Sequence, residues 1–213
     1  MGVQPQPDFA SRARTSLPME TTGYLLRRGL LLEYVTLGWN VVGTVVVVWA
    51  AIAAHSVALA GFGLDSLIEI VASVVVVWQL TNAGRDREKI ALRIIGIAFL
   101  ALALYVLVQS AVTLISRSHP NPSPAGIVWL VATMVAMLWL SFAKRRTGLE
   151  LNNSILVTEA KVTLVDAYLA AAVLCGLVVN AIIGWWWADP LAGLVIVYYG
   201  LAEGTHTLRE LRA

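Results

Sequence analysis

Six long apolar stretches, separated by short polar segments, make up most of the chain after about residue 29. Each stretch can form a helix of about 20 residues or more, the length needed to cross ~30 Å of hydrocarbon. The predicted helices cover residues 29–54, 56–80, 90–116, 125–143, 154–181 and 188–208. The pattern therefore predicts an all-α polytopic membrane protein with six transmembrane helices.

The segments outside these helices predict a simple domain organisation. Residues 1–26 are polar and lack the apolar core of a secretory signal, so we expect a disordered cytoplasmic tail that stays attached. Residues 27–210 then form a single transmembrane domain. We expect no C-terminal cytosolic domain, because the sequence ends at Ala213.

Composition agrees with a lipid environment and excludes several functions. Hydrophobic residues make up 59% of the chain and charged residues only 13%, which is far from the composition of soluble domains. The net charge is +2, and no basic block is long enough to indicate nucleic-acid binding. Cys175 is the single cysteine, which excludes an intramolecular disulfide and a thiolate metal cluster. We expect a non-enzymatic membrane protein without a tightly bound cofactor.

Lysine and arginine are distributed unequally between the two sides of the predicted bundle. The side that holds both tails and the second and fourth linkers carries nearly all of them, whereas the linkers of the opposite side carry only Arg117. By the positive-inside rule this predicts that both termini are cytoplasmic, in what we expect to be the cell (inner) membrane. The residues counted on the cytoplasmic side are Arg12, Arg14, Arg27, Arg28, Arg85, Arg87, Lys89, Arg93, Lys144, Arg145, Arg146, Arg209 and Arg212.

Three acidic residues fall near the middle of predicted helices. Asp65 and Glu69 are four residues apart and share one helix face, and Asp166 lies at a comparable depth in the fifth helix. Ionised carboxylates at such depths are costly, so they usually face a cavity or a partner. Either these carboxyls are protonated, or a bound cation neutralises them. The alternative is that they are hydrogen-bonded contacts between helices without a role in transport.

Further polar residues surround this cluster. Glu33, Glu159 and Glu203 lie one or two turns inside the predicted cytoplasmic boundary, where they form either an acidic vestibule or side chains that reach the headgroups. Lys161 is expected to pair with Glu159 or to reach the interface. Asp189, which precedes a proline, predicts the N-cap of the last helix.

Two segments of the sequence resemble the cation diffusion facilitator (cation efflux) family. The family's second-helix pattern is matched by Ser56-Val57-Ala58-Leu59, Gly63, Asp65, Ser66-Leu67 and Glu69. Its fifth and sixth helices are matched by Glu159-Ala160, Asp166, Gly176 and the run Trp186-Trp187-Ala188-Asp189-Pro190-Leu191-Ala192. The resemblance implies a six-helix metal exporter coupled to inward proton movement, with Asp65, Glu69 and Asp166 as metal ligands.

The sequence departs from the family pattern at one of its four ligand positions. Four residues before Asp166 the family has His or Asp, whereas this chain has Val162. Three carboxylates without an imidazole favour harder ions such as Mn2+ or Mg2+ over Zn2+. A fourth ligand could come from water, Asn40, Thr163 or Ser66.

These observations support two main hypotheses from different functional classes. In the first, the chain exports a divalent cation of the Zn, Mn, Fe or Co class in exchange for protons. Its expected partners are the lipid bilayer and a second copy of the chain in a homodimer. In the second, suggested by Val162, it is a membrane scaffold or regulatory partner that has kept the fold and lost the metal chemistry. A proton channel that uses the same acids is a third interpretation.

Overall fold

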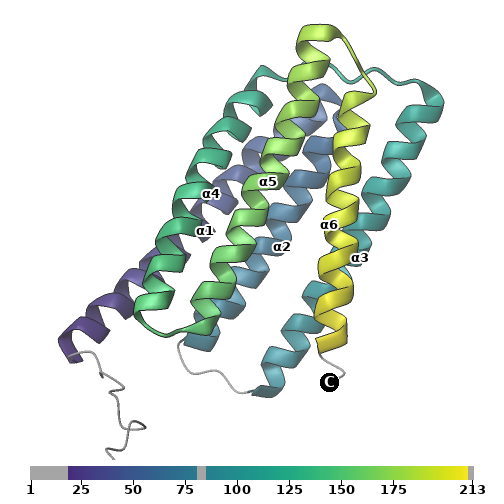
Figure 1. The fold of residues 1–213 in the computed structure, drawn as a ribbon. Coiled ribbons are helices and arrows are strands. Elements are labelled where there is room, and N and C mark those ends of the chain that lie inside the picture. The colour runs from purple at the N-terminus through teal and green to yellow at the C-terminus, as the bar shows by residue number, and fades with distance from the viewer. Residues whose placement is uncertain (1–18, 81–84, 211–213) are drawn as a thin grey trace, which may run out of the picture.

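The computed structural model describes residues 19–80 and 85–210, and in these residues it contains six α-helices and no strand (Figure 1). This confirms the predicted all-α class and number of helices. The helices are α1 (Met19–Ala54), α2 (Val57–Leu80), α3 (Arg85–Ser116), α4 (Pro124–Glu150), α5 (Ser154–Ile183) and α6 (Ala188–Glu210).

Helices α1, α3 and α4 are clearly longer than the sequence predicted, and α3 begins at Arg85 instead of near residue 90. Helix α1 begins at Met19, so residues 19–26 of the expected disordered tail are helical, while residues 1–18 lie outside the described part of the chain. Helix α4 continues to Glu150 instead of ending near residue 143. The polar residues that follow residue 143 extend the helix, and the linker is confined to residues 151–153.

Helix α2 lies at the centre of the bundle, where it contacts α1, α3, α5 and α6 (Figure 1). Helices α4 and α5 run side by side, as do α3 and α6. Close helix approach depends on small residues, as is common between membrane helices. A Cβ atom at Gly176 of α5 would lie only 2.7 Å from the Cβ of Ala192 in α6. This contact places α5, which carries Asp166, directly against α6.

Four stretches of the described residues are long and apolar enough to cross a membrane: Gly23–Ala54, Gly96–Ser116, Pro124–Glu150 and Leu156–Ile183. Large apolar side chains such as Trp49, Ile115 and Ile182 are exposed on the outside of the bundle, as expected of surfaces that face lipid. The protein is therefore an integral membrane protein. The start of α1, the end of α6 and the α4–α5 connection lie at the same end of the bundle (Figure 1).

Asp189 stabilises the start of a different helix from the one that the sequence predicted. It lies in the first turn of α6, but its buried carboxylate accepts hydrogen bonds from Ser56 Oγ, Val57 N (2.9 Å) and Ala58 N (3.4 Å) at the start of α2. The Ser56 hydroxyl in turn accepts a hydrogen bond from Leu59 N. The prediction that Asp189 caps its own helix is wrong, because the chain brings the free N–H groups of α2 next to α6.

Replacing Asp189 with alanine should destabilise the protein by about 1–3 kcal/mol, because it leaves buried donors at the start of α2 without an acceptor. Thermal unfolding in detergent would measure this as a lower midpoint temperature. Asp189→Asn keeps one acceptor oxygen and should lose less stability. Equal stability of Asp189→Ala and the wild type would contradict the role assigned to this carboxylate.

Candidate metal centre

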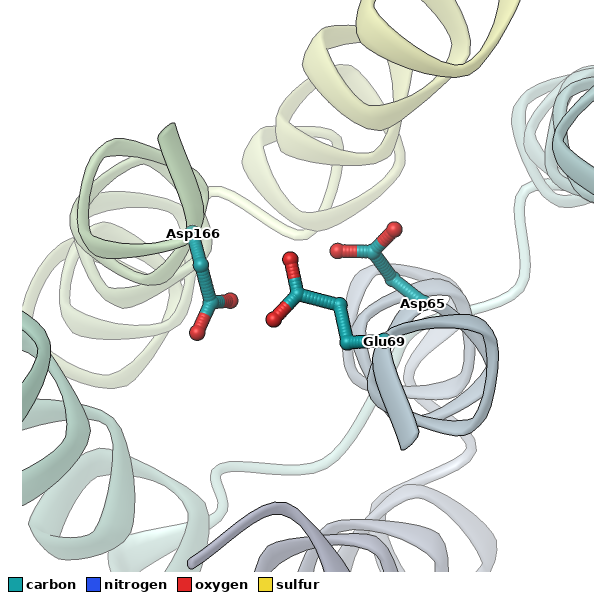
Figure 2. A group of neighbouring side chains, drawn as sticks. All are labelled: Asp65, Glu69 and Asp166. Carbon is teal, nitrogen blue, oxygen red and sulfur yellow. The ribbon is translucent and has the colours of Figure 1, made fainter. Parts of the chain in front are cut away.

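Asp65, Glu69 and Asp166 converge in the interior of the bundle (Figure 2). One carboxylate oxygen from each residue lies within 4.8 Å of those of the other two, and all three side chains are buried. Asp65 and Glu69 come from consecutive turns of α2, and Asp166 points toward them from α5. The i, i+4 spacing on α2 and the contact between α2 and α5 together produce this acidic triad.

Most oxygens of the α2 pair have no protein partner. Both oxygens of Asp65 and Oε1 of Glu69 are buried and accept no hydrogen bond from the described residues. The other oxygen of Glu69 accepts a hydrogen bond of 3.3 Å from Nδ2 of Asn40 in α1. Residues that serve only as hydrogen-bonded contacts between helices would have their oxygens paired, because an unpaired buried acceptor costs ~1–3 kcal/mol. The triad therefore fits a group that binds protons or a cation.

The dimensions of the triad suit a small divalent ion. Two oxygens bound to one ion at ~2.1 Å can be separated by no more than ~4.2 Å. The observed limit of 4.8 Å is larger by only a fraction of an ångström, which side-chain rotation can supply. Carboxylate oxygens without sulfur or imidazole ligands favour hard cations.

The candidates for a fourth ligand differ in their surroundings. Asn40 contacts Glu69 directly and so lies beside the triad. The hydroxyl of Thr163 is directed elsewhere, since it donates to the carbonyl of Glu159 and accepts from Lys144. Ser66 donates to the carbonyl of Phe62 within α2. Of these three protein candidates, Asn40 is the one whose side chain contacts a triad carboxylate.

Lys144 is a buried cation that the sequence analysis did not identify. Its side chain is fully buried, and its ammonium forms an ion pair with Glu33 of α1 at 3.0 Å and with Glu159 of α5 at 3.7 Å. From the sequence, Lys144 is predicted to lie in a cytoplasmic linker and to contribute to the positive-inside bias. That assignment is wrong because α4 continues past it. The available signal was a polar residue at every third position, namely Ser141, Lys144 and Thr147, because this spacing keeps neighbouring members on one side of a helix. In the structure all three are buried.

The three acids of the predicted vestibule have different neighbours in the structure. Glu33 and Glu159 both pair with Lys144, and Glu203, half-buried on α6, is close enough to Asp65 for its charge to act there. Glu159 pairs with Lys144 instead of Lys161, which is exposed. Residues two positions apart on a helix point in different directions, which explains why Lys161 and Glu159 do not meet.

Tyr199 of α6 also lies near the triad and was not identified from the sequence. It is close enough to Asp65 and Glu69 for their charges to act on its hydroxyl. Its ring packs edge-on against Phe99 of α3, with the ring centroids 5.8 Å apart. No polar periodicity in α6 marks this residue, so only the packing of α6 on α2 reveals it.

Comparison with known proteins gives consistent matches. An uncharacterised transporter of Synechocystis is 25% identical over 73% of this chain and 54% of its own length. Metal tolerance protein 10 of Arabidopsis thaliana is 26% identical over 95% of this chain and 49% of its own length. The cation-efflux pump FieF of Shewanella oneidensis is 27% identical over 63% of this chain and 48% of its own length. The chain thus spans about half the length of these relatives.

The family match covers most of the chain. Residues 34–212 match the cation efflux transmembrane domain, which includes all three residues of the triad and five of the six helices in full. The resemblance noted in the second, fifth and sixth helices is confirmed by this match. The chain therefore belongs to the cation efflux family.

Proposed function

We propose that this protein moves a divalent metal cation out of the cytoplasm in exchange for protons, with Asp65, Glu69 and Asp166 as the ligands of the transported ion. The observation that carries the proposal is the buried convergence of these three carboxylates, whose α2 oxygens lack protein partners. Membership of the cation efflux family supports transport, and two of the relatives are named as a metal tolerance protein and a cation-efflux pump.

The exchange with protons follows from the chemistry of the ligands. Carboxyls must lose their protons to bind a metal ion, so the two kinds of cation compete for the same oxygens. When the site faces the cytoplasm, a metal ion displaces protons from the triad. When the site faces the other side, protons displace the metal ion. The helices that carry the triad, α2 and α5, must then change their packing so that each side gains access in turn.

The ion that this site favours is a hard divalent cation. Asn40 is a neutral oxygen donor once its amide is rotated to turn its oxygen toward the ion, and it completes a set of oxygen ligands. Because Val162 supplies no imidazole, we infer that Mn2+, and Mg2+ at higher concentration, are better substrates than Zn2+.

The test is metal-driven proton flux in proteoliposomes that contain a pH-sensitive dye. Wild-type protein should respond to Mn2+, and Asp65→Asn should reduce the rate to the background of empty liposomes. The matched control is Glu150→Gln, which removes an exposed acid that pairs with Arg146 outside the triad, and this variant should keep the wild-type rate. A proton flux that is the same with and without each metal would indicate a proton channel instead.

A non-transporting scaffold is the second candidate function, and Val162 favours it. In that case the wild-type chain binds no divalent metal, although it is folded and inserted. Calorimetry with Mn2+, Zn2+, Co2+ and Fe2+ separates the two functions, since the proposed transporter requires binding of at least one of these ions at the triad.

A further inference from the structure

The ammonium of Lys144 is surrounded by oxygens from two other helices. Nζ lies 3.0 Å from Oε2 of Glu33, 3.2 Å from Oγ1 of Thr163 and 3.7 Å from Oε2 of Glu159. These ligands come from α1 and α5, whereas the lysine comes from α4. Two carboxylates and a hydroxyl are the kind of ligands that hard cations take from proteins.

This group lies on the same polar helix faces as the acidic triad. On α5, Glu159 and Thr163 precede Asp166 by seven and three residues, and on α1, Glu33 precedes Asn40 by seven. Seven residues correspond to ~10 Å along a helix axis. Both displacements run toward the bundle end that contains the start of α1 and the α4–α5 connection (Figure 1). The Lys144 group therefore lies between the triad and this end.

The two groups are also linked electrostatically. Lys144 is close enough to Glu69 and to Asp166 for its charge to act on both. A metal ion in the triad would therefore be repelled by the ammonium. The binding energy of an ion at the triad therefore depends on where the Lys144 ammonium lies.

The ammonium does not use the full capacity of its ligands. Glu33 is completely buried, yet its Oε1 has no hydrogen-bond partner among the described residues. Two carboxyl groups face a single ammonium, so the group can offer a divalent cation two anionic ligands. An ammonium carries one charge and has three N–H donors, whereas a divalent ion would neutralise both carboxylates.

We propose that Glu33, Glu159 and Thr163 form a second cation-binding site on the route of the transported ion, and that Lys144 is a tethered cation that fills this site when no metal ion is passing. This inference rests on the proposed transport function. In the resting protein the ammonium blocks the polar route between the triad and the end of the bundle that is expected to face the cytoplasm. An arriving divalent ion displaces the ammonium from Glu33 and Glu159 and then moves on to the triad.

The proposal can be tested by binding alone, in a background that cannot bind metal at the triad. The starting variant carries Asp65→Asn, Glu69→Gln and Asp166→Asn, and adding Lys144→Ala empties the second site. Equilibrium dialysis with Mn2+ should then detect one ion bound per chain that the starting variant lacks. Adding Glu33→Gln should abolish this binding. No gain of Mn2+ binding by folded protein would overturn the proposal.

A matched control removes a cation of the same helix that is not buried. Arg146 pairs with Glu150 on the exposed face of α4, so Arg146→Ala should add no Mn2+ binding. The triad is disabled in all these variants, so a negative result would not argue against metal transport through the triad. Conversely, a wild-type protein without metal-driven flux would not change what the binding test says about the second site.

Loss of Lys144 leaves two carboxylates uncompensated, so folding must be followed by size-exclusion chromatography. If Lys144→Ala aggregates without metal, Mn2+ should restore a monodisperse protein, because the ion replaces the missing ammonium. Lys144→Gln serves as the second variant, since its amide keeps a donor for Glu33 without a charge. If neither variant is rescued by Mn2+, a metal ion cannot take the place of the ammonium and the proposal is wrong.

Discussion

Asp166→Asn should lower the affinity for Mn2+ by about 100-fold or more and abolish metal-driven proton flux. The substitution keeps the shape of the side chain but removes one of three negative charges from a site that holds all three in the interior of the bundle. Loss of even an outer-shell partner of a metal ligand typically costs ~10–100-fold in affinity, so loss of a charged ligand should cost at least as much. Titration calorimetry in detergent measures the affinity.

The same titrations report proton release when they are repeated in buffers of different ionisation enthalpy. Wild-type protein should release protons on binding Mn2+, and its affinity should rise with pH because protons compete for the carboxylate oxygens. Asp166→Asn should release fewer protons and show a weaker pH dependence. Unchanged affinity in this variant would remove Asp166 from the metal site and leave Asp65 and Glu69 as a simple α2 pair.

Val162→His should shift the preference of the site toward Zn2+, with an increase in Zn2+ affinity of about tenfold or more relative to Mn2+. Residue 162 lies one turn before Asp166 on the same side of α5, so an imidazole there can reach the ion that Asp166 binds. Imidazole is a better ligand for Zn2+ than for Mn2+, and tenfold corresponds to only ~1.4 kcal/mol. Competition between the two metals in binding and flux assays measures the shift.

The control for this variant is Val162→Leu, which changes the volume of the side chain without adding a ligand and should leave the ratio of Zn2+ to Mn2+ affinity unchanged. The experiment also separates the two candidate functions. A scaffold without metal chemistry would bind no metal before the substitution and would gain binding only with the histidine. A transporter with a complete carboxylate site binds Mn2+ in both forms.

Much of the candidate metal centre was predictable because it depends on helix periodicity. An i, i+4 pair of acids in one apolar segment must share a face, and a third acid at similar depth in another segment can meet it if the two helices pack together. Asp65, Glu69 and Asp166 met this condition, and the contact between α2 and α5 brought them together. The family pattern added weight because it involved these same positions.

The local sequence could not reveal which charges pair. Lys144 follows an apolar segment directly and begins a run of three basic residues, which is typical of a helix end at the cytoplasmic surface. Lys144 can be buried because it pairs with Glu33, which lies 111 positions earlier in the chain, and because α1 packs beside α4. Periodicity places a side chain on a face of its own helix, but it does not say what the neighbouring helix presents there.

The sequence by itself determined the membrane environment, the six helices, the family and the three acids, because all of these follow from hydropathy and from spacing within segments. The tertiary structure alone decided that Asp189 caps α2 and that Lys144 is a buried cation paired with Glu33 and Glu159. The physical reason is the same in each case. Buried charges and free helix ends must find partners, and in this bundle the partners lie on helices that are distant in the chain.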